Sequence, residues 1–289
     1  MWDSSVLPAA PGSEPGWEAD RIDLEAYFAR IGYHGGREVG FETLRGLHRA
    51  HNRAITWEIL DGVLDNRLDL TVDHIQRKIV AAGRGGCCLE SNILFAAALE
   101  QLGFPVVRHI ARVRRGNPKI RTRSHVVPIV EVEGELWMAD PGFGDESPLE
   151  PIRFQDGAQL TVGDWVWRLD LDGTEWVLRS MHADGWFDVY AWVMEHHHPI
   201  DFHMINHFSY VDPDSVFLNR IVVQRGDDQA RYVLRDDTLV TTAPDGTVKT
   251  ERLSPAEVVE SIRGLFNIRL SDAEGAVVSE HCAAVMARA

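Results

Sequence analysis

The spacing of apolar residues changes at Gly103 and Pro105, and this change constrains the fold more than any other feature of the sequence. Before it, apolar residues recur at helical spacing over 22–31, 44–55, 72–80 and 94–102. After it, strand-like runs cover 106–113, 125–132, 135–140, 164–170 and 175–179. Helices followed by a series of strands predict an α+β fold, in which a helical region precedes an antiparallel sheet or a small barrel.

The last part of the chain mixes both patterns. Strand-like runs cover 217–223, 230–234 and 238–240, and Asp245-Gly246 is a favourable hairpin turn. Ser254-Pro255-Ala256-Glu257 is a capping box that opens a helix running to about Phe266. At the other end of the chain, residues 1–19 combine prolines and glycines with polar residues, so we expect a loose arm there.

The charge balance excludes several classes of partner. The 289 residues include 44 acidic and 29 basic side chains, which give a formal net charge of −15. An acidic surface of this kind opposes binding to nucleic acids and to anionic membranes. Three cysteines (Cys87, Cys88 and Cys282) are too few for a disulfide framework, and free thiols fit a reducing cytoplasm. We find no membrane-spanning apolar run and no secretory signal, so we expect a cytoplasmic protein.

A candidate nucleophile lies at the turn before the fourth predicted helix. Gly85 and Gly86 free the backbone just before Cys87 and Cys88, and the helical pattern follows at once. A cysteine in the first turn of a helix lies near unpaired backbone N–H groups and the positive end of the helix dipole. Both features favour the thiolate, which is the reactive form of cysteine.

A base and an orienting carboxylate follow in a predicted hairpin that turns at Glu133-Gly134. A two-residue loop pairs Val132 with Glu135, and the same register pairs Val127 with Asp140. His125, two residues before Val127, then points to the same face of the sheet as Asp140. The sequence thus predicts a triad of Cys88, His125 and Asp140, in which the carboxylate orients the imidazole and the imidazole accepts the thiol proton.

These motifs, taken in order, resemble the arylamine N-acetyltransferase family. The family signature is Arg-Gly-Gly-x-Cys with Asn four residues later, a strand that begins with His, and then Asp-x-Gly-Phe-Gly. Here these are Arg84 to Cys88 with Asn92, then His125, and then Asp140 to Gly144. Weaker similarity spans roughly residues 22–270 and includes 44–51, Asn206 and 213–217.

Three departures from the family pattern affect the lining of the pocket, although none removes a catalytic group. Cys87 stands where the family usually has an aromatic residue, and Pro141 stands where it usually has valine. Thr56-Trp57-Glu58-Ile59-Leu60 replaces a run similar to Pro-Phe-Glu-Asn-Leu. The resemblance nevertheless selects Cys88 as the nucleophile and leaves Cys87 as a wall residue.

The resemblance implies a helical bundle over 20–104 that carries the cysteine, a β-barrel-like domain over 105–205 that carries the histidine and aspartate, and an α/β lid over 206–289. The core of this fold is a Cys-His-Asp site like that of cysteine proteases. The resemblance also implies acetyl-CoA as the donor, an arylamine or arylhydrazine as the acceptor, no metal, and a ping-pong reaction through acetylated Cys88. It makes the following residues candidates for contact with substrate or CoA: Asn92, Ser124, Gly142, Phe143, Gly144 and Phe217. Arg84 is then a structural residue near the site, and Glu58 is its expected ion-pair partner.

Two other features have an ordinary and a functional interpretation. The cationic run over 108–123 is either a solvated strand edge or a region that attracts the phosphates of CoA through Arg114 and Arg115. His196 to His198, with His203 and His207, resemble a metal site, but only His203 and His207 have helical spacing and no zincin-like glutamate accompanies them.

Three other functions remain open at the level of sequence. The same triad serves an amide synthase that takes an acyl chain from a carrier protein, and a thiol hydrolase of acyl thioesters. A degenerate binding module is the non-enzyme alternative. The sequence also leaves open whether the chain is a monomer or a homodimer, and where residues 271–289 lie.

Overall fold

A computed structural model describes residues 16–66, 69–117, 119–213 and 215–288. Its helical part confirms the four predicted helical patterns. It consists of η2 (Ala19–Arg21), α1 (Leu24–Ile31), α2 (Phe41–Ala54), η3 (Leu60–Gly62), α3 (Val72–Ile75), η4 (Gln76–Ala81) and α4 (Cys88–Gln101). The predicted third helix is thus divided, because α3 continues as the wider π-helical turn of η4.

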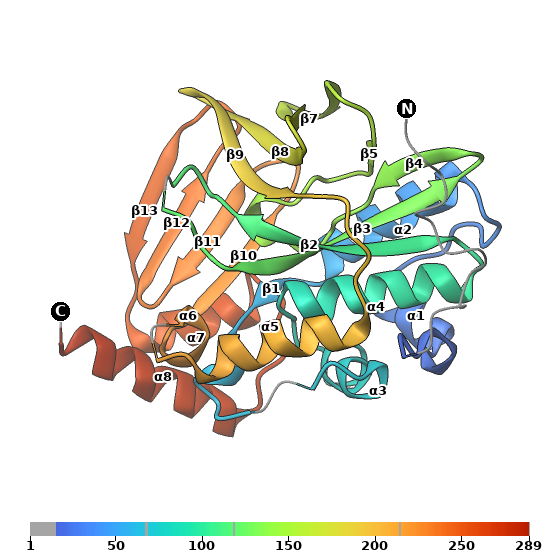
Figure 1. Cartoon of the computed structure of the whole chain (residues 1–289). Helices are drawn as coiled ribbons and strands as arrows, with labels where there is room; N and C mark the ends of the chain where they lie inside the picture. Colours follow the sequence, from blue (N-terminus) through green and yellow to red (C-terminus); the bar gives the residue numbers. More distant parts are fainter. Residues whose placement is uncertain (1–15, 67–68, 118, 214, 289) are drawn as a thin grey trace.

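Helix α4 lies at the centre of this helical part, beneath strands β2 and β3 (Figure 1). Its residues are buried from Cys88 to Leu99 on every face, which explains why its apolar residues do not form a single stripe. The helices pack around α4 through Tyr27, Leu44, Leu47 and Phe95, all of which are fully buried.

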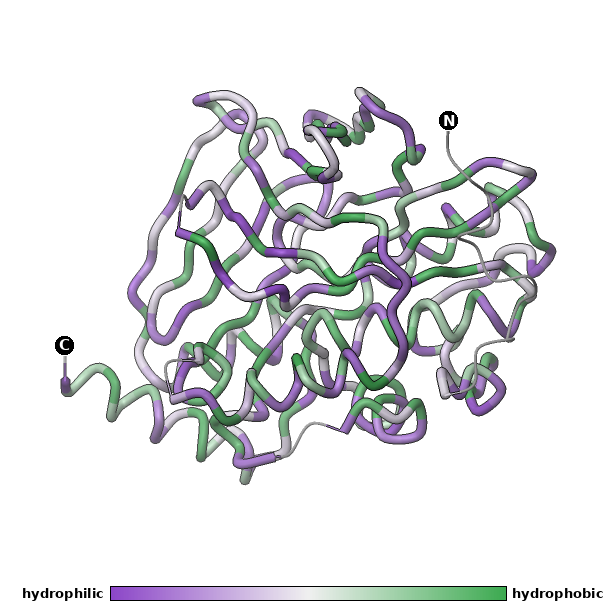
Figure 2. Tube along the Cα trace, in the orientation of Figure 1, coloured by the Kyte–Doolittle hydropathy of each residue, from purple (hydrophilic) through white to green (hydrophobic). Residues whose placement is uncertain are grey.

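An eight-stranded antiparallel sheet follows, in the order β5-β4-β3-β2-β9-β8-β7-β6. Its strands are β2 (Val106–Val113), β3 (Arg123–Val132), β4 (Glu135–Met138), β5 (Ile152–Arg153), β6 (Ala158–Val162), β7 (Trp165–Asp172), β8 (Glu175–His182) and β9 (Gly185–Trp192). The sheet curls into a nearly closed barrel, because β5 and β6 at its two edges approach each other. Hydrophobic and hydrophilic residues are interspersed along the chain (Figure 2), and β7 buries every second residue over most of its length, whereas β2 and β3 are buried over long continuous runs.

The C-terminal part combines a second sheet with two helices. The sheet has the order β1-β10-β11-β12-β13 and contains β1 (Trp57–Glu58), β10 (Val222–Gly226), β11 (Arg231–Arg235), β12 (Thr238–Thr242) and β13 (Val248–Arg252). Strand β1 comes from the helical part, so this sheet joins the two regions. Helices α7 (Pro255–Arg263) and α8 (Asp272–Met286) pack against each other (Figure 1). Residues of α8 such as Val278 and Cys282 belong to the hydrophobic cluster that α7 and the second sheet also form.

One sequence expectation about local structure was wrong, and one helix was not predicted. The run 217–223 does not form one strand, because α6 (Val216–Asn219) occupies its first half. Ser215 caps this short helix by accepting a hydrogen bond from the backbone of Phe217, and strand β10 begins only at Val222. Helix α5 (Pro199–Val211), which precedes α6, was not predicted.

The expected loose arm over 1–19 also needs correction at its inner end. Residues 1–15 lie outside the described residues, but Trp17 is buried and its ring packs against that of Phe202, with 5.1 Å between the centroids. The guanidinium of Arg108 lies 4.1 Å from the centroid of the Trp17 ring. The chain is therefore anchored from Trp17 onward by an aromatic and cation–π cluster. None of the described helices has the length and apolarity needed to cross a bilayer.

Candidate active site

The two glycines before the candidate nucleophile permit a close approach to β1. A Cβ atom at Gly85 would lie 2.2 Å from the carbonyl oxygen of Thr56, and one at Gly86 would lie 2.7 Å from the Ile79 side chain. The close approach allows the Gly86 N–H to donate to Thr56 O at 3.1 Å. The turn then delivers Cys87 as the N-cap of α4 and Cys88 as its first residue. This is the geometry that the sequence predicted for a cysteine at a helix N-terminus.

His125 and Asp140 meet, and β3 and β4 pair in the register that the sequence predicted, but β4 ends before it reaches Asp140. Val132 pairs with Glu135 as predicted, but the pairing of β3 with β4 ends at Ile129 and Met138. Val127 therefore has no strand partner at Asp140, which lies two residues beyond the end of β4. His125 Nε2 nevertheless lies 2.7 Å from Asp140 Oδ2, and both side chains are fully buried.

Four hydrogen bonds hold the carboxylate of Asp140. Its Oδ1 accepts from Asn92 Nδ2 at 2.7 Å and from the backbone N–H of Gly142 at 3.0 Å. Its Oδ2 accepts from the Tyr190 hydroxyl at 2.6 Å in addition to His125. A carboxylate with this many donors stays ionised even when buried, because the hydrogen bonds favour its charged form. The pKa of Asp140 is accordingly lowered: burial raises it, but the charge of His125 and the hydrogen bonds outweigh burial.

Tyr190 is a residue that the sequence analysis missed. It lies on β9, a strand that was not predicted, and its ring centroid is 4.6 Å from that of His125. Phe143 contacts the imidazole from another side with an edge-to-face geometry, at a centroid distance of 4.7 Å. The turn residues at 183–185 followed by Trp186 and Phe187 were the sequence signal that could have revealed this strand.

The remaining ring nitrogen of His125 is available to the nucleophile. Among the described residues, His125 Nδ1 is buried and has no hydrogen-bond partner. Cys88 is 7% exposed, and in its thiol form the sulfur donates to the carbonyl oxygen of Ser124 at 3.5 Å. Ser124 directly precedes His125 on β3, so this contact holds the thiol next to the imidazole.

The pKa values describe a thiolate–imidazolium pair. The thiol of Cys87 and then the His125 imidazole lower the pKa of Cys88 to about 5, despite the opposing effect of burial. Burial lowers the pKa of His125, but the charges of Asp140 and Cys88 outweigh it and raise the pKa to about 9. Between about pH 5 and pH 9 the proton therefore resides on the imidazole and the sulfur is anionic, which is the reactive state.

The glycine motif after Asp140 lies where the sequence placed it. A Cβ at Gly142 would lie 2.6 Å from Asn92 Oδ1, and Gly144 has φ +85° and a similarly close approach to the Gln224 side chain. Both glycines are therefore needed for close packing around the carboxylate. Phe217 lies apart from these contacts: its ring packs near those of Trp57 and Tyr210, at centroid distances of 6.4 Å and 5.8 Å.

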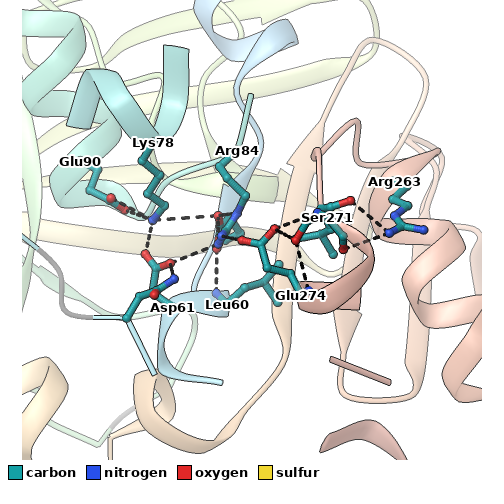
Figure 3. Close-up of polar contacts among 11 residues, drawn as sticks. Leu60, Asp61, Lys78, Arg84, Glu90, Arg263, Ser271 and Glu274 are labelled. Carbon is teal, nitrogen blue, oxygen red and sulfur yellow. Dashed lines mark hydrogen bonds and ion pairs between the residues drawn. The ribbon is translucent and has the colours of Figure 1, made fainter. Parts of the chain in front are cut away.

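The predicted ion pair of Arg84 with Glu58 is present and belongs to a larger buried network (Figure 3). Arg84 Nε and Nη2 both donate to Glu58 Oε1, at 3.0 Å and 2.7 Å. Arg84 also contacts Asp61 at 3.2 Å and, through Nη1, Glu274 of α8 at 3.3 Å. Helix α8 is thus tied to the turn that precedes the nucleophile.

The cationic run over 108–123 is largely neutralised by acidic side chains. Arg114 donates to Asp188 at 2.8 Å and to Glu175 at 2.9 Å, and Arg115 donates to Asp145 at 2.6 Å. The two arginines expected to attract phosphate are therefore already engaged in ion pairs.

His203 and His207 lie on α5 beside a surface groove of about 530 Å³, whose apolar walls include Ile200, Met204 and Phe208. No candidate catalytic residue lines this groove, and within the described residues no group of three metal-binding side chains occurs.

Known proteins resemble this chain over nearly its whole length. A family model described as N-acetyltransferase matches residues 40–275. The arylamine N-acetyltransferase of Escherichia coli K12 is 32% identical over 267 residues, which cover 91% of this chain and 95% of that protein. The structure of a Nocardia farcinica arylamine N-acetyltransferase has a TM-score of 0.86 at 38% identity, covering 94% of this chain and 98% of that chain. The Mycobacterium marinum arylamine N-acetyltransferase in complex with CoA has a TM-score of 0.83 at 28% identity, with coverage of 90% and 98%.

Proposed function

This chain belongs to the arylamine N-acetyltransferase family, and we propose that it transfers an acetyl group from acetyl-CoA to an arylamine or arylhydrazine through acetylated Cys88. The observation that carries this mechanism is the buried His125–Asp140 pair, at 2.7 Å, beside a cysteine at the N-terminus of α4. The α+β fold and the acyltransferase class follow from the family.

In the first half-reaction, the Cys88 thiolate attacks the carbonyl carbon of acetyl-CoA. The new C–S bond replaces the C–S bond to CoA, so one thioester is exchanged for another. The departing CoA sulfur takes the proton that His125 carries, which leaves the imidazole neutral. The pKa of His125, raised to about 9, makes it protonated in the resting site and hence ready to act as this acid.

In the second half-reaction, the neutral imidazole of His125 becomes the base. The amine nitrogen attacks the acetyl carbon, His125 accepts the amine proton, and the Cys88 sulfur leaves as a thiolate. The thiolate–imidazolium pair is thereby restored, and the amide product departs. Asp140 remains ionised throughout and orients the ring through Nε2.

The CoA complex of the M. marinum relative supports acetyl-CoA as the donor. Ser124, Gly142, Phe143 and Gly144 surround the triad and are proposed to contact the acetyl group or its carrier, and Asn92 supports Asp140. Phe217, with Trp57 and Tyr210, is proposed to line the acceptor side of the pocket. The reaction requires no metal. All three cysteines are free thiols, which supports a cytoplasmic location.

Intact-mass measurement tests this proposal. Incubation with acetyl-CoA should add one acetyl group, peptide mapping should locate it on Cys88, and addition of an aromatic amine should remove it. Cys88→Ser should give no adduct and no turnover, whereas the matched variant Cys87→Ser should retain both. Release of free CoA without an amine would indicate a thiol hydrolase. Absence of both adduct and turnover would contradict the proposal and favour a carrier-protein substrate or a binding function.

A further inference from the structure

Five ionisable side chains are buried together next to the turn that precedes Cys88, and Figure 3 shows four of them, namely Asp61, Lys78, Arg84 and Glu90. Lys78 of η4 and Arg84 of the turn face three carboxylates, namely Glu58 of β1, Asp61 of η3 and Glu90 of α4. Each of the five side chains is at most 9% exposed. Burial of so many charges is costly unless each has a partner, and the triad chemistry uses none of them.

Glu90 connects this cluster to the backbone of the nucleophile turn. Its Oε2 accepts the backbone N–H of Cys87 at 3.0 Å, which makes Glu90 the third-position residue of a capping box. Both of its oxygens also accept from Lys78 Nζ, at 2.9 Å and 2.8 Å. Lys78 in turn contacts Asp61 and lies 3.9 Å from Glu58 Oε1. The carboxylate of Glu90 therefore cannot rotate away from the Cys87 backbone without breaking its bonds to a buried ammonium.

We propose that Glu90, held by Lys78, is a positioning residue for the nucleophile: it fixes the backbone of Cys87, and thereby the place of the Cys88 sulfur relative to His125. This inference rests on the proposed role of Cys88. Glu90 acts through the backbone and does not touch the reacting atoms. The same cluster reaches α8 through Arg84 and Glu274, but that branch leads away from Glu90.

The balance of charges within the cluster explains how the Glu90 carboxyl can be buried there. Three carboxylates face two cations, so one negative charge is in excess, and burial raises the pKa of Glu90 to about 7 against the opposing effect of Lys78. Near neutral pH the Glu90 carboxyl is therefore partly protonated. Replacing it with a neutral side chain leaves two cations and two carboxylates, and a variant at this position is expected to fold.

Groups from several elements change the pKa of Cys88, and their contributions must be separated from that of Glu90. His125 and Asp140 act from the barrel side, and Cys87 acts from the turn. Glu90 and Lys78 act on Cys87 with opposite signs, because the carboxylate raises the pKa of the Cys87 thiol and the ammonium lowers it. Tyr210 of α5 packs nearby and is neutral, since burial raises its pKa. Removing the charge of Glu90 alone should therefore leave the Cys88 thiolate unchanged or slightly favoured.

A pair of Glu90 variants separates position from charge. Glu90→Gln removes the charge but keeps an oxygen that can accept the Cys87 N–H, whereas Glu90→Leu removes both. The measurement is the rate at which iodoacetamide alkylates Cys88 as a function of pH, read by peptide mapping on the full-length protein. Glu90→Gln should stay within about twofold of the parent rate. Glu90→Leu should raise the midpoint of the profile by about one pH unit, so that it alkylates nearly tenfold more slowly below pH 5, whereas its rate at neutral pH stays close to that of the parent.

Two further measurements keep the test decisive. Glu274→Gln removes the charge from the contact of α8 with Arg84 without touching Glu90, and it should leave the alkylation profile unchanged even if it lowers the melting temperature. Acetyl transfer by Glu90→Leu should lose about tenfold in kcat with a similar KM for acetyl-CoA. If Glu90→Leu does not fold, Lys78→Met carries the same expectation, since Glu90 then loses the ammonium that holds it.

A folded Glu90→Leu with the parent alkylation profile would overturn the inference while leaving the proposed function intact. An equal loss in Glu90→Gln and Glu90→Leu would also overturn it, because charge rather than position would then matter. Failure of the parent protein itself to alkylate at Cys88 near neutral pH would instead contradict the proposed function. The two failures are thus distinguishable in one experiment.

Discussion

Replacement of Asp140 by asparagine tests the candidate triad most directly, because both carboxylate oxygens are fully engaged. Oδ1 accepts from the Gly142 backbone and the Asn92 amide, and Oδ2 accepts from His125 and Tyr190. An asparagine offers one oxygen and one NH₂ group, so it can satisfy only one of these two pairs of donors. The Gly142 N–H is fixed by the backbone, and we therefore expect the amide oxygen to take the place of Oδ1.

The NH₂ group of the asparagine then faces His125 Nε2. That nitrogen must accept a hydrogen bond, so the ring proton moves to Nδ1, the nitrogen that serves the thiol. In the parent protein the carboxylate is a main reason that the pKa of His125 rises from 6.5 to about 9. A change of this size corresponds to about 3 kcal/mol of lost imidazolium stabilisation, at ~1.4 kcal/mol per pH unit.

The thiolate should respond in the same direction. Without an imidazolium partner, the pKa of Cys88 should rise from about 5 toward its ordinary value of 9.0 without reaching it, because the hydrogen bond with the Cys87 thiol, the largest cause of the lowered pKa, remains. Below the new midpoint, alkylation slows by about tenfold for each pH unit of this rise. Acetyl transfer should fall further, by roughly a thousandfold or more, because the base is also in the wrong tautomer.

The assay is the pH dependence of Cys88 alkylation, combined with thermal unfolding to verify the fold. The lowered pKa of Cys88 means that the parent rate should rise through about pH 5 and then stay level to about pH 9. Asp140→Asn should instead rise only toward pH 9. Asp170→Asn, which alters a carboxylate that pairs with Arg168 and Arg179 of the barrel, is the matched control and should behave like the parent. A parental profile in folded Asp140→Asn would refute the proposed coupling of carboxylate, imidazole and thiol.

Three further changes have definite expectations. Tyr190→Phe removes the hydroxyl 2.6 Å from Asp140 Oδ2, and kcat should fall by about tenfold, or about 1–2 kcal/mol; unchanged steady-state kinetics would count against this contact. Arg84→Lys replaces a forked guanidinium by a single ammonium and should lower the free energy of unfolding by about 1–3 kcal/mol in urea titrations; an unaltered midpoint would argue against a structural role for the fork. Gly142→Ala would place its Cβ 2.6 Å from Asn92 Oδ1, so both the melting temperature and activity should drop, whereas a neutral outcome would mean that the loop can shift freely.

Local sequence signals were sufficient for most of the fold and for the three catalytic candidates. The patterns at 22–31, 44–55 and 94–102 correspond to α1, α2 and α4, because helix periodicity and helix ends are written in neighbouring residues. The turn before Cys88 was predictable for the same reason. The carboxylate was predicted from the correct register of β3 and β4, although β4 ends at Met138 and Asp140 contacts His125 from just beyond the strand.

The misses of Tyr190 and α8 share a physical cause, which is dependence on contacts between distant residues, whereas the miss at 216–219 has a local cause. Tyr190 is 50 residues from Asp140 in sequence, and its hydroxyl has no local feature that identifies it as a partner of a carboxylate. The segment at 216–219 has apolar residues that suit a strand, but the cap from Ser215 starts a helix instead. Helix α8 joins the core through Cys282 and contacts Arg84 from 190 residues away. No spacing rule within one segment could have placed it.

The candidate nucleophile Cys88 lies where the helical region and the barrel meet, and this has a consequence for reactivity. From the barrel, the carbonyl of Ser124 and the imidazole of His125 face the sulfur. From the helical region, Glu90 holds the backbone one residue earlier. A small shift of α4 against β3 would therefore weaken the thiolate–imidazolium pair without changing any residue of the triad. Buried ionic pairs contribute little net stability to a protein. The buried cluster around Lys78 and Arg84 is therefore better explained by the need to hold α4 in a fixed position against the barrel than by stability alone.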